Sequence, residues 1–315
     1  SSRFTAPRST TFVGTETFAG TETFAGTETF AGTETSARRT IRVRRLLAAL
    51  LIVQLAAAWA VLAVAQPESG PQSGSASSSL TMVDGRSVRL TNLGGARTDD
   101  LLNRVGADMS AAIGAVERFW GTDWTPEIVI VATGSGAQFA AEARLDPRRE
   151  WVDIAAVSVA DEVDFDRREA PGQRIVLAPG ASDMTDSALR IVLTHELFHV
   201  AARTETALDA PRWLTEGVAD FVARPFAPLP SGAAASAALP SDADLDATGP
   251  DRSAGYDRAW WFARFVADTY GVDGLRRLYA QACGPGHGDL DAAVRGALGT
   301  DLADLQAQWA GWLTR

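Results

Sequence analysis

A pair of histidines four residues apart, His195 and His199, most constrains how this chain can fold, because the pair lies inside an almost wholly apolar stretch. The chain has 315 residues and only 3 histidines. Thr185 is suited to cap a helix that begins at Asp186, and the residues that follow leave hardly any polar face. The pattern predicts a buried helix with both imidazoles on one side, about 6 Å apart.

Two imidazoles in this arrangement can bind one Zn²⁺, and Glu196 follows the first of them directly. Such a glutamate lies beside the metal, where a general base must be to take a proton from a metal-activated water. The other interpretation is a pair of core histidines with a surface glutamate. A third protein ligand elsewhere in the chain would favour the metal site.

The predicted third ligand is Glu216, in the run Trp213–Asp220, which reads WLTEGVAD. A helix is expected to begin at Pro211, a residue suited to a first helical turn. Glu216 and Asp220 are four residues apart and share one face of it. Glu216 can then bind the metal while Asp220 accepts the far N–H of a ligand histidine.

With these two motifs the chain resembles the gluzincin, or peptidase-MA-like, metallopeptidases, in which an HExxH helix is followed by a helix carrying W-L-x-E-G-x-A. The resemblance implies that His195, His199 and Glu216 bind zinc. It also implies that Glu196 is the catalytic base and that Asp220 supports a ligand histidine from the second coordination shell. Sixteen residues separate His199 from Glu216, fewer than in the best-known members. The intervening loop is therefore expected to be tight.

Two other acids, Glu205 and Asp209, are alternative ligands, but neither has the flanking pattern of Glu216. A metzincin would instead need a glycine and a third histidine soon after His199, where Ala-Ala-Arg-Thr-Glu stands. For the oxyanion donor, Tyr256 is the candidate, because Tyr256–Trp260 resembles the Y-x-K-G-A stretch of gluzincin aminopeptidases. His287 is the rival donor; a capping or core tyrosine and a solvated loop histidine are the other interpretations.

The region from residue 80 to 315 is predicted to hold the peptidase domain, with a sheet lobe and active-site helix over 80–205 and a helical lobe over 206–315. The expected fold class is α+β and zincin-like, with a mixed sheet. Thr98 is expected to cap an amphipathic helix, and residues 224–250 to form a rim, a lid or a disordered insertion. Strands are expected at Val88–Leu90, Ile128–Ala132, Val152–Val159 and Arg174–Ala178. Of these, Ile154–Val159 is the expected edge for an extended peptide, although an internal strand fits nearly as well.

The first 79 residues predict an anchor and a tether. Residues 1–40 contain a six-residue repeat with too few apolar groups for a core, and are expected to be disordered. Arginines then precede an uncharged run over 46–65, which predicts a transmembrane helix or signal anchor over 41–65, followed by a flexible linker over 66–79. The expected location is the cell membrane with the peptidase domain outside, or secretion if the chain is cleaved after Ala65.

Composition limits the partners. A formal net charge of -10 argues against nucleic acid, and the single cysteine excludes an intrachain disulfide and a cysteine-based zinc site. The resemblance to gluzincins implies zinc-dependent hydrolysis of a peptide or protein substrate as the expected activity. The alternative is an inactive ectodomain in which zinc only joins two helices and the surface binds a partner; hydrolysis of a non-peptide amide also stays open.

Overall fold

The computed structural model describes residues 16–18, 76–148, 151, 154–235 and 237–315. Within them a six-stranded sheet has the order β1-β5-β6-β4-β3-β2. The central strands β3, β4 and β6 run parallel, whereas β2, β5 and β1 pair antiparallel with their neighbours. The strands are β1 (Glu16–Phe18), β2 (Ser77–Val83), β3 (Arg86–Asn92), β4 (Glu127–Ala132), β5 (Ile154–Val159) and β6 (Arg174–Leu177).

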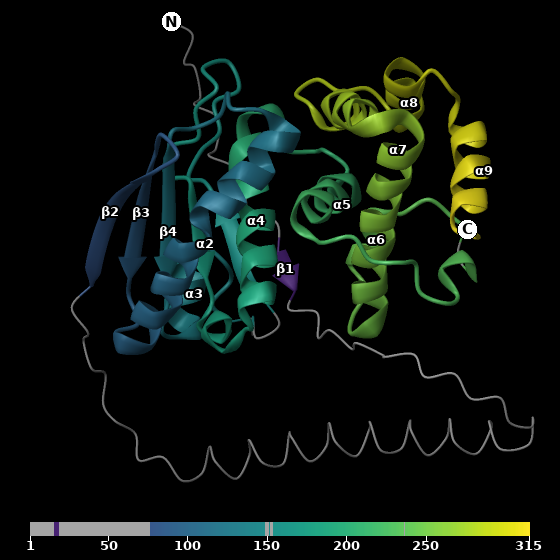
Figure 1. The fold of residues 1–315 in the computed structure, drawn as a ribbon. Helices are drawn as coiled ribbons and strands as arrows, with labels where there is room; N and C mark the ends of the chain where they lie inside the picture. Colours follow the sequence, from purple (N-terminus) through teal and green to yellow (C-terminus); the bar gives the residue numbers. More distant parts are fainter. Residues whose placement is uncertain (1–15, 19–75, 149–150, 152–153, 236) are drawn as a thin grey trace, which may run out of the picture. The chain divides into compact units, whose positions relative to one another are not determined.

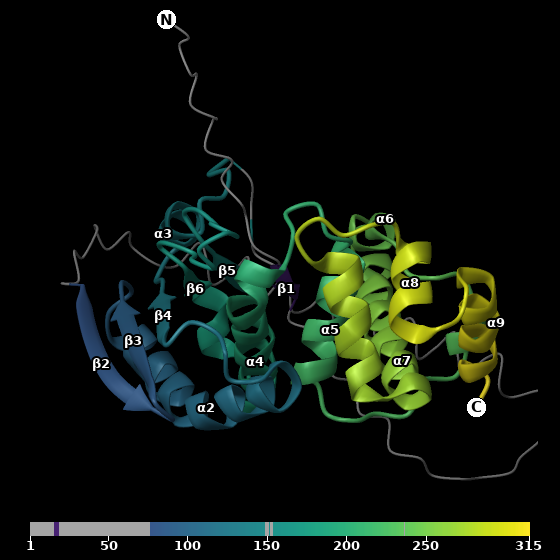
Figure 2. The same cartoon turned by 90° about the horizontal axis from the view of Figure 1, so that it is seen from above.

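Helices cover both faces of this sheet. α2 (Ala96–Trp120) and α4 (Asp186–Ala202) pack on one face, and the shorter α3 (Gly136–Glu142) packs on the other, as Figures 1 and 2 show. The alternating apolar residues of β3 and β4 bury their side chains in the main core, on the face that α2 covers. Helix α4 packs against α2, β5 and β6.

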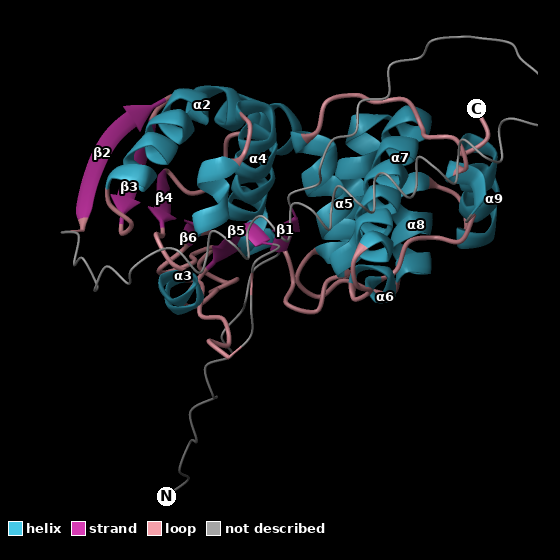
Figure 3. Ribbon diagram, turned by 90° about the horizontal axis from the view of Figure 1, so that it is seen from below, coloured by secondary structure: helices cyan, strands magenta, loops and turns pink. Residues whose placement is uncertain are grey.

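From residue 206 on, the regular elements of the described chain are all helices, which loops connect, as Figure 3 shows by its colours. Short 3-10 turns η1 (Pro179–Asp183), η2 (Arg203–Glu205) and η3 (Ala233–Ala235) lie between longer elements. Helix α7 bends at Gly271, whose φ of 78° is rarely adopted by other residues. The helices are α5 (Arg212–Ala223), α6 (Asp242–Leu245), α7 (Pro250–Cys283), α8 (Leu290–Leu298) and α9 (Leu302–Trp312).

The connection between α5 and α7 packs onto the helices. Arg264 donates to the carbonyl of Ala227 at 2.6 Å, and the backbone N–H of Trp213 donates to the Asp242 carboxylate at 2.8 Å. Arg258 donates to the carbonyl of Ala238 at 2.7 Å. The described residues of this connection are therefore tied to α5 and α7, and the expectation of a disordered insertion is wrong for them.

Two parts of the predicted fold class need correction. The class is mixed α/β rather than α+β, because parallel strand pairs need crossover connections and α2 supplies one between β3 and β4. The second correction concerns the predicted transmembrane helix and, with it, the predicted membrane location: among the described residues, no helix is long and apolar enough to cross a membrane. Residues 41–65, for which that helix was predicted, lie outside the described residues.

Three local expectations also differ from the structure. Helix α2 begins at Ala96, so Thr98 lies in its first turn, where its hydroxyl contacts the Asn92 side chain at 2.5 Å instead of capping the helix. Strand β2 begins at Ser77, inside the predicted linker. Strand β5 pairs with β6 on one side and with β1 on the other, so the expected free edge is covered along part of its length.

Candidate metal centre

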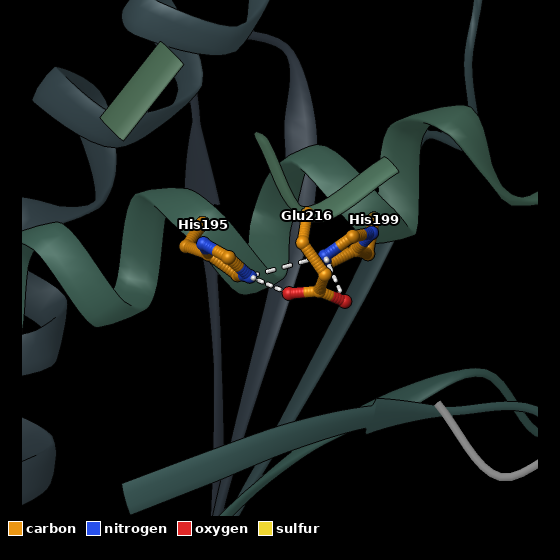
Figure 4. A group of neighbouring side chains, drawn as sticks. All are labelled: His195, His199 and Glu216. Carbon is orange, nitrogen blue, oxygen red and sulfur yellow. Dashed lines mark hydrogen bonds and ion pairs between the residues drawn. The ribbon is translucent and has the colours of Figure 1, made fainter. Parts of the chain in front are cut away.

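Helix α4 carries the two histidines into the interior. The side chain of Thr185 accepts a hydrogen bond from the backbone N–H of Ala188 at 3.3 Å, which satisfies one of the free donors of the first turn. His195 is 1% exposed and His199 is 7% exposed. The sheet lies on one side of α4, and α5 lies on the other. Both imidazoles face Glu216 of α5, so they project into the α4–α5 interface (Figure 4).

Three ligand atoms converge in this interface, as Figure 4 shows. The Nε2 atoms of His195 and His199 are 3.1 Å apart. Glu216, from α5, places Oε2 3.1 Å from His195 Nε2 and Oε1 3.8 Å from His199 Nε2. Among the described residues, these three form the group that can hold a metal ion, with ligand atoms within 4.8 Å of one another.

These separations fit a tetrahedral ion. Zn–N and Zn–O bonds of about 2.0–2.1 Å at the tetrahedral angle place neighbouring ligand atoms roughly 3.3 Å apart. Glu216 Oε1 is buried and has no hydrogen-bond partner in the part of the chain that the structure describes, although an orphaned buried oxygen is costly. A shared cation would satisfy that oxygen and both facing ring nitrogens.

Asp220 supports the arrangement from α5. Its Oδ1 lies 2.9 Å from Nδ1 of His195, and its side chain is 3% exposed. An acceptor at this distance holds the proton on Nδ1, so the Nε2 lone pair is directed at Glu216 and His199 once His195 has lost its other proton. The structure therefore brings Asp220 to the position that the helical spacing predicts.

In the metal-free site, the pKa values of His195 and Glu216 are raised, so these groups retain protons to higher pH than usual. Burial alone would lower the pKa of His195, but hydrogen bonds to Asp220 and Glu216 outweigh it and raise the pKa to about 10. Burial raises the pKa of Glu216 to about 7, against the lowering effect of His195. Burial, with the neighbouring charge of His195, keeps the pKa of His199 well below its usual value. A bound metal ion would take the place of the His195 proton.

Glu196 is fully buried on α4. The buried Arg203, seven residues further along the chain, interacts with it electrostatically; burial lowers the pKa of Arg203 to about 10, and the charge of Glu196 opposes that shift. Arg203 also donates to the carbonyl and the hydroxyl of Ser158 on β5, both at 2.8 Å. This arginine ties the end of α4 to the sheet.

The two candidate oxyanion donors differ in their surroundings. Tyr256 is 9% exposed on the second turn of α7, and its phenol lies within electrostatic range of Arg212 at the start of α5. His287 lies in the loop after α7, with Nδ1 2.8 Å from the carbonyl of Gly288 and Nε2 3.4 Å from Asp209. Neither residue belongs to the metal-binding group found in the described residues, and the oxyanion role of Tyr256 stays a prediction.

The alternative third ligands lie elsewhere. Glu205 pairs with Arg168, and Asp209 is a largely exposed residue near His287. The geometry therefore favours Glu216 over both acids as the third ligand.

Two groups near the site were not predicted from the sequence. Arg224 contacts Asp220, and Tyr279 is fully buried with its hydroxyl 2.8 Å from that of Thr206. Burial raises the pKa of Tyr279 well above its usual value, and the charges of Arg203 and Glu216 also act on it. The four-residue spacing between Asp220 and Arg224, the residue that follows α5, was the available signal for the first. Tyr279 is 63 residues beyond Glu216, and only the packing of α7 brings it near.

The chain was compared with known proteins. No family model matches it, and no curated protein matches it. Among solved structures, the crystal structure of Legionella pneumophila aminopeptidase A in complex with aspartic acid is similar, with a TM-score of 0.43 and 14% sequence identity. The similarity covers 75% of this chain and only 28% of that chain. The geometry of the site, and not this similarity, carries the functional conclusion.

Proposed function

We propose that this chain is a zinc-dependent peptidase of the gluzincin type. The observation that carries the proposal is the buried group of His195, His199 and Glu216, with Glu196 next to its first member on the same helix. Two imidazoles and one carboxylate form a ligand set typical of catalytic zinc, which needs three protein ligands and an open position. A glutamate beside such a set is typical of a hydrolytic site.

In this proposal each residue has a defined task. A Zn²⁺ ion held by His195, His199 and Glu216 would supply Lewis acidity, which would lower the pKa of water to about 7 and polarise the substrate carbonyl. Glu196 accepts the proton of the attacking water at a carboxylate oxygen and delivers it to the nitrogen of the leaving amine. Asp220 holds the Nδ1 proton of His195, and Tyr256 is the proposed donor to the developing oxyanion.

The test is Glu196→Gln, assayed for zinc content and for cleavage of a peptide library. We expect the variant to bind zinc like the wild type while its rate of cleavage falls about 10²- to 10⁴-fold, because the amide cannot accept the proton. Glu205→Gln is the matched control, since Glu205 pairs with Arg168 and lies outside the metal-binding group. It should retain wild-type activity.

The result also separates this proposal from a binding module in which a metal only joins α4 to α5. Equal cleavage by wild type and Glu196→Gln would contradict the mechanism. A protein that binds zinc but cleaves no member of the library would favour the binding module. A protein that binds no zinc would contradict the class.

A further inference from the structure

The two oxygens of Asp220 contact different partners. Oδ1 lies 2.9 Å from Nδ1 of His195, and Oδ2 lies 2.8 Å from a terminal nitrogen of Arg224. Because the carboxylate is planar, an orientation that satisfies both contacts at once is restricted. Arg224 therefore limits the rotation of the group that orients a metal ligand.

The other terminal nitrogen of Arg224 contacts a residue of α7. It lies 2.7 Å from Asp257 Oδ1 on α7, and the guanidinium lies over the Trp260 ring with its carbon 5.0 Å from the ring centroid. The fork of an arginine can contact two carboxylates through separate nitrogens, which the compact ammonium of a lysine does less well. Arg224 is thus held between Asp220 and Asp257. Asp257 lies on α7 and directly follows Tyr256.

We propose that Arg224 is a positioning residue for the metal centre, which fixes the Asp220 carboxylate and through it the orientation of His195. This inference rests on the proposed function, since it concerns a metal held by His195, His199 and Glu216. Partners that hydrogen-bond to metal ligands typically change metal affinity by about 10- to 100-fold when they are removed. Here Arg224 acts one contact further out than Asp220.

A purely structural role has to be separated from this one, because Arg224 also follows the last residue of α5 and joins it to α7. Arg264 provides the matched control. Its guanidinium lies over the same Trp260 ring, 5.2 Å from the centroid, and donates to the carbonyl of Ala227. Removal of its charge therefore disturbs the same aromatic packing, without removing a contact to Asp220.

The experiment uses the full chain with Arg224→Gln, Arg224→Lys and Arg264→Gln. For each variant, the dissociation constant of zinc is measured by competition with a chromophoric chelator. The visible spectrum of the cobalt-loaded protein reports ligand geometry, and the Tm of the metal-free protein reports folding. We expect Arg224→Gln to weaken zinc binding up to about 10-fold, at the lower end of the effect of removing a direct partner of a metal ligand, and to change the cobalt spectrum. Arg224→Lys should recover part of the lost affinity, and Arg264→Gln should keep wild-type affinity whatever its Tm.

Three outcomes would overturn the inference while the wild type still binds zinc and cleaves peptides. The first is an Arg224→Gln variant with wild-type zinc affinity and cobalt spectrum. The second is an equal loss of affinity in Arg264→Gln, and the third is no recovery in Arg224→Lys. A wild-type chain that binds no zinc would overturn the proposed function together with this inference, so the two failures are distinguishable.

Discussion

The α4–α5 interface and the contact between α7 and α9 are equally buried, but the first contains titratable side chains and the second contains aromatic ones. In the first, His195 and Glu216 are 1% and 0% exposed and face each other as titratable groups. In the second, Phe265 lies at the centre of an aromatic cluster, with ring centroids 5.6 Å from Trp309 and 6.2 Å from Trp312. Although the two contacts are equally buried, they are therefore expected to contribute differently to the stability of the fold.

The difference follows from the physics of desolvation. Burial of apolar surface stabilises a protein by about 25 cal/mol per Å². Burial of an ionised carboxylate is costly, and its partners repay the cost only with good geometry. The aromatic cluster should thus stabilise the chain under all conditions, whereas the α4–α5 interface should depend on protons and on metal.

The largest expected effect comes from Phe265→Ala in the aromatic cluster. Removal of a fully buried phenylalanine should lower the free energy of unfolding by about 3–5 kcal/mol, because the cavity left behind adds to the lost burial. Urea unfolding at several pH values measures it. The loss should be the same from pH 6.5 to 9, and zinc affinity should match the wild type. A loss that varied steeply with pH would show that the two interfaces are coupled.

The second prediction concerns the metal-free protein between pH 6.5 and 9. The pKa of His195 is raised from 6.5 to about 10, so its stabilising effect is complete below pH 6.5 and decreases as the pH rises towards 10. The raised pKa of Glu216 acts in the same direction between pH 4.5 and about 7. After removal of metal by a chelator, the Tm should therefore fall as the pH rises.

Zinc should reverse this trend, because binding requires a deprotonated His195. At a free zinc concentration about 1,000 times the dissociation constant, binding stabilises the fold by roughly 4 kcal/mol, and this increment should grow with pH. Paired thermal scans with and without zinc measure it. A zinc increment independent of pH would contradict the proton exchange at His195.

The smallest expected effect concerns strand β1. Ala178 donates to the carbonyl of Ala155, so the polar backbone groups of Ala156 are directed away from β6, towards Thr17 on β1. Thr17→Pro removes a backbone donor and should lower the free energy of unfolding by no more than about 1 kcal/mol.

If extended peptides bind along β5, as its sequence predicts, the same substitution should lower KM for a peptide substrate, because β1 competes for the same edge, while kcat stays the same. Thr81→Pro on β2, at the other edge of the sheet, is the control. An unchanged KM in Thr17→Pro would contradict peptide binding along β5.

Much of the candidate site could be predicted because its residues are related by helical spacing. His195 with His199, and Glu216 with Asp220, are pairs four residues apart, and a helix places such pairs on one face in any context. Strands β4 and β6 were predictable from short apolar runs between turn residues. The start of α2 was predicted one turn too late, because the side chain of Asn92 organises that turn by accepting from the N–H of Gly95.

The candidate metal ligands could be named from the sequence, since ligand chemistry and helix periodicity are local properties. The fold was needed to show that Glu216 meets both histidines, that Arg224 connects Asp220 to Asp257, and that β1 covers part of β5. Those contacts join segments tens to hundreds of residues apart, and they depend on how apolar faces pack and which strands pair. No short-range pattern in the sequence encodes that choice.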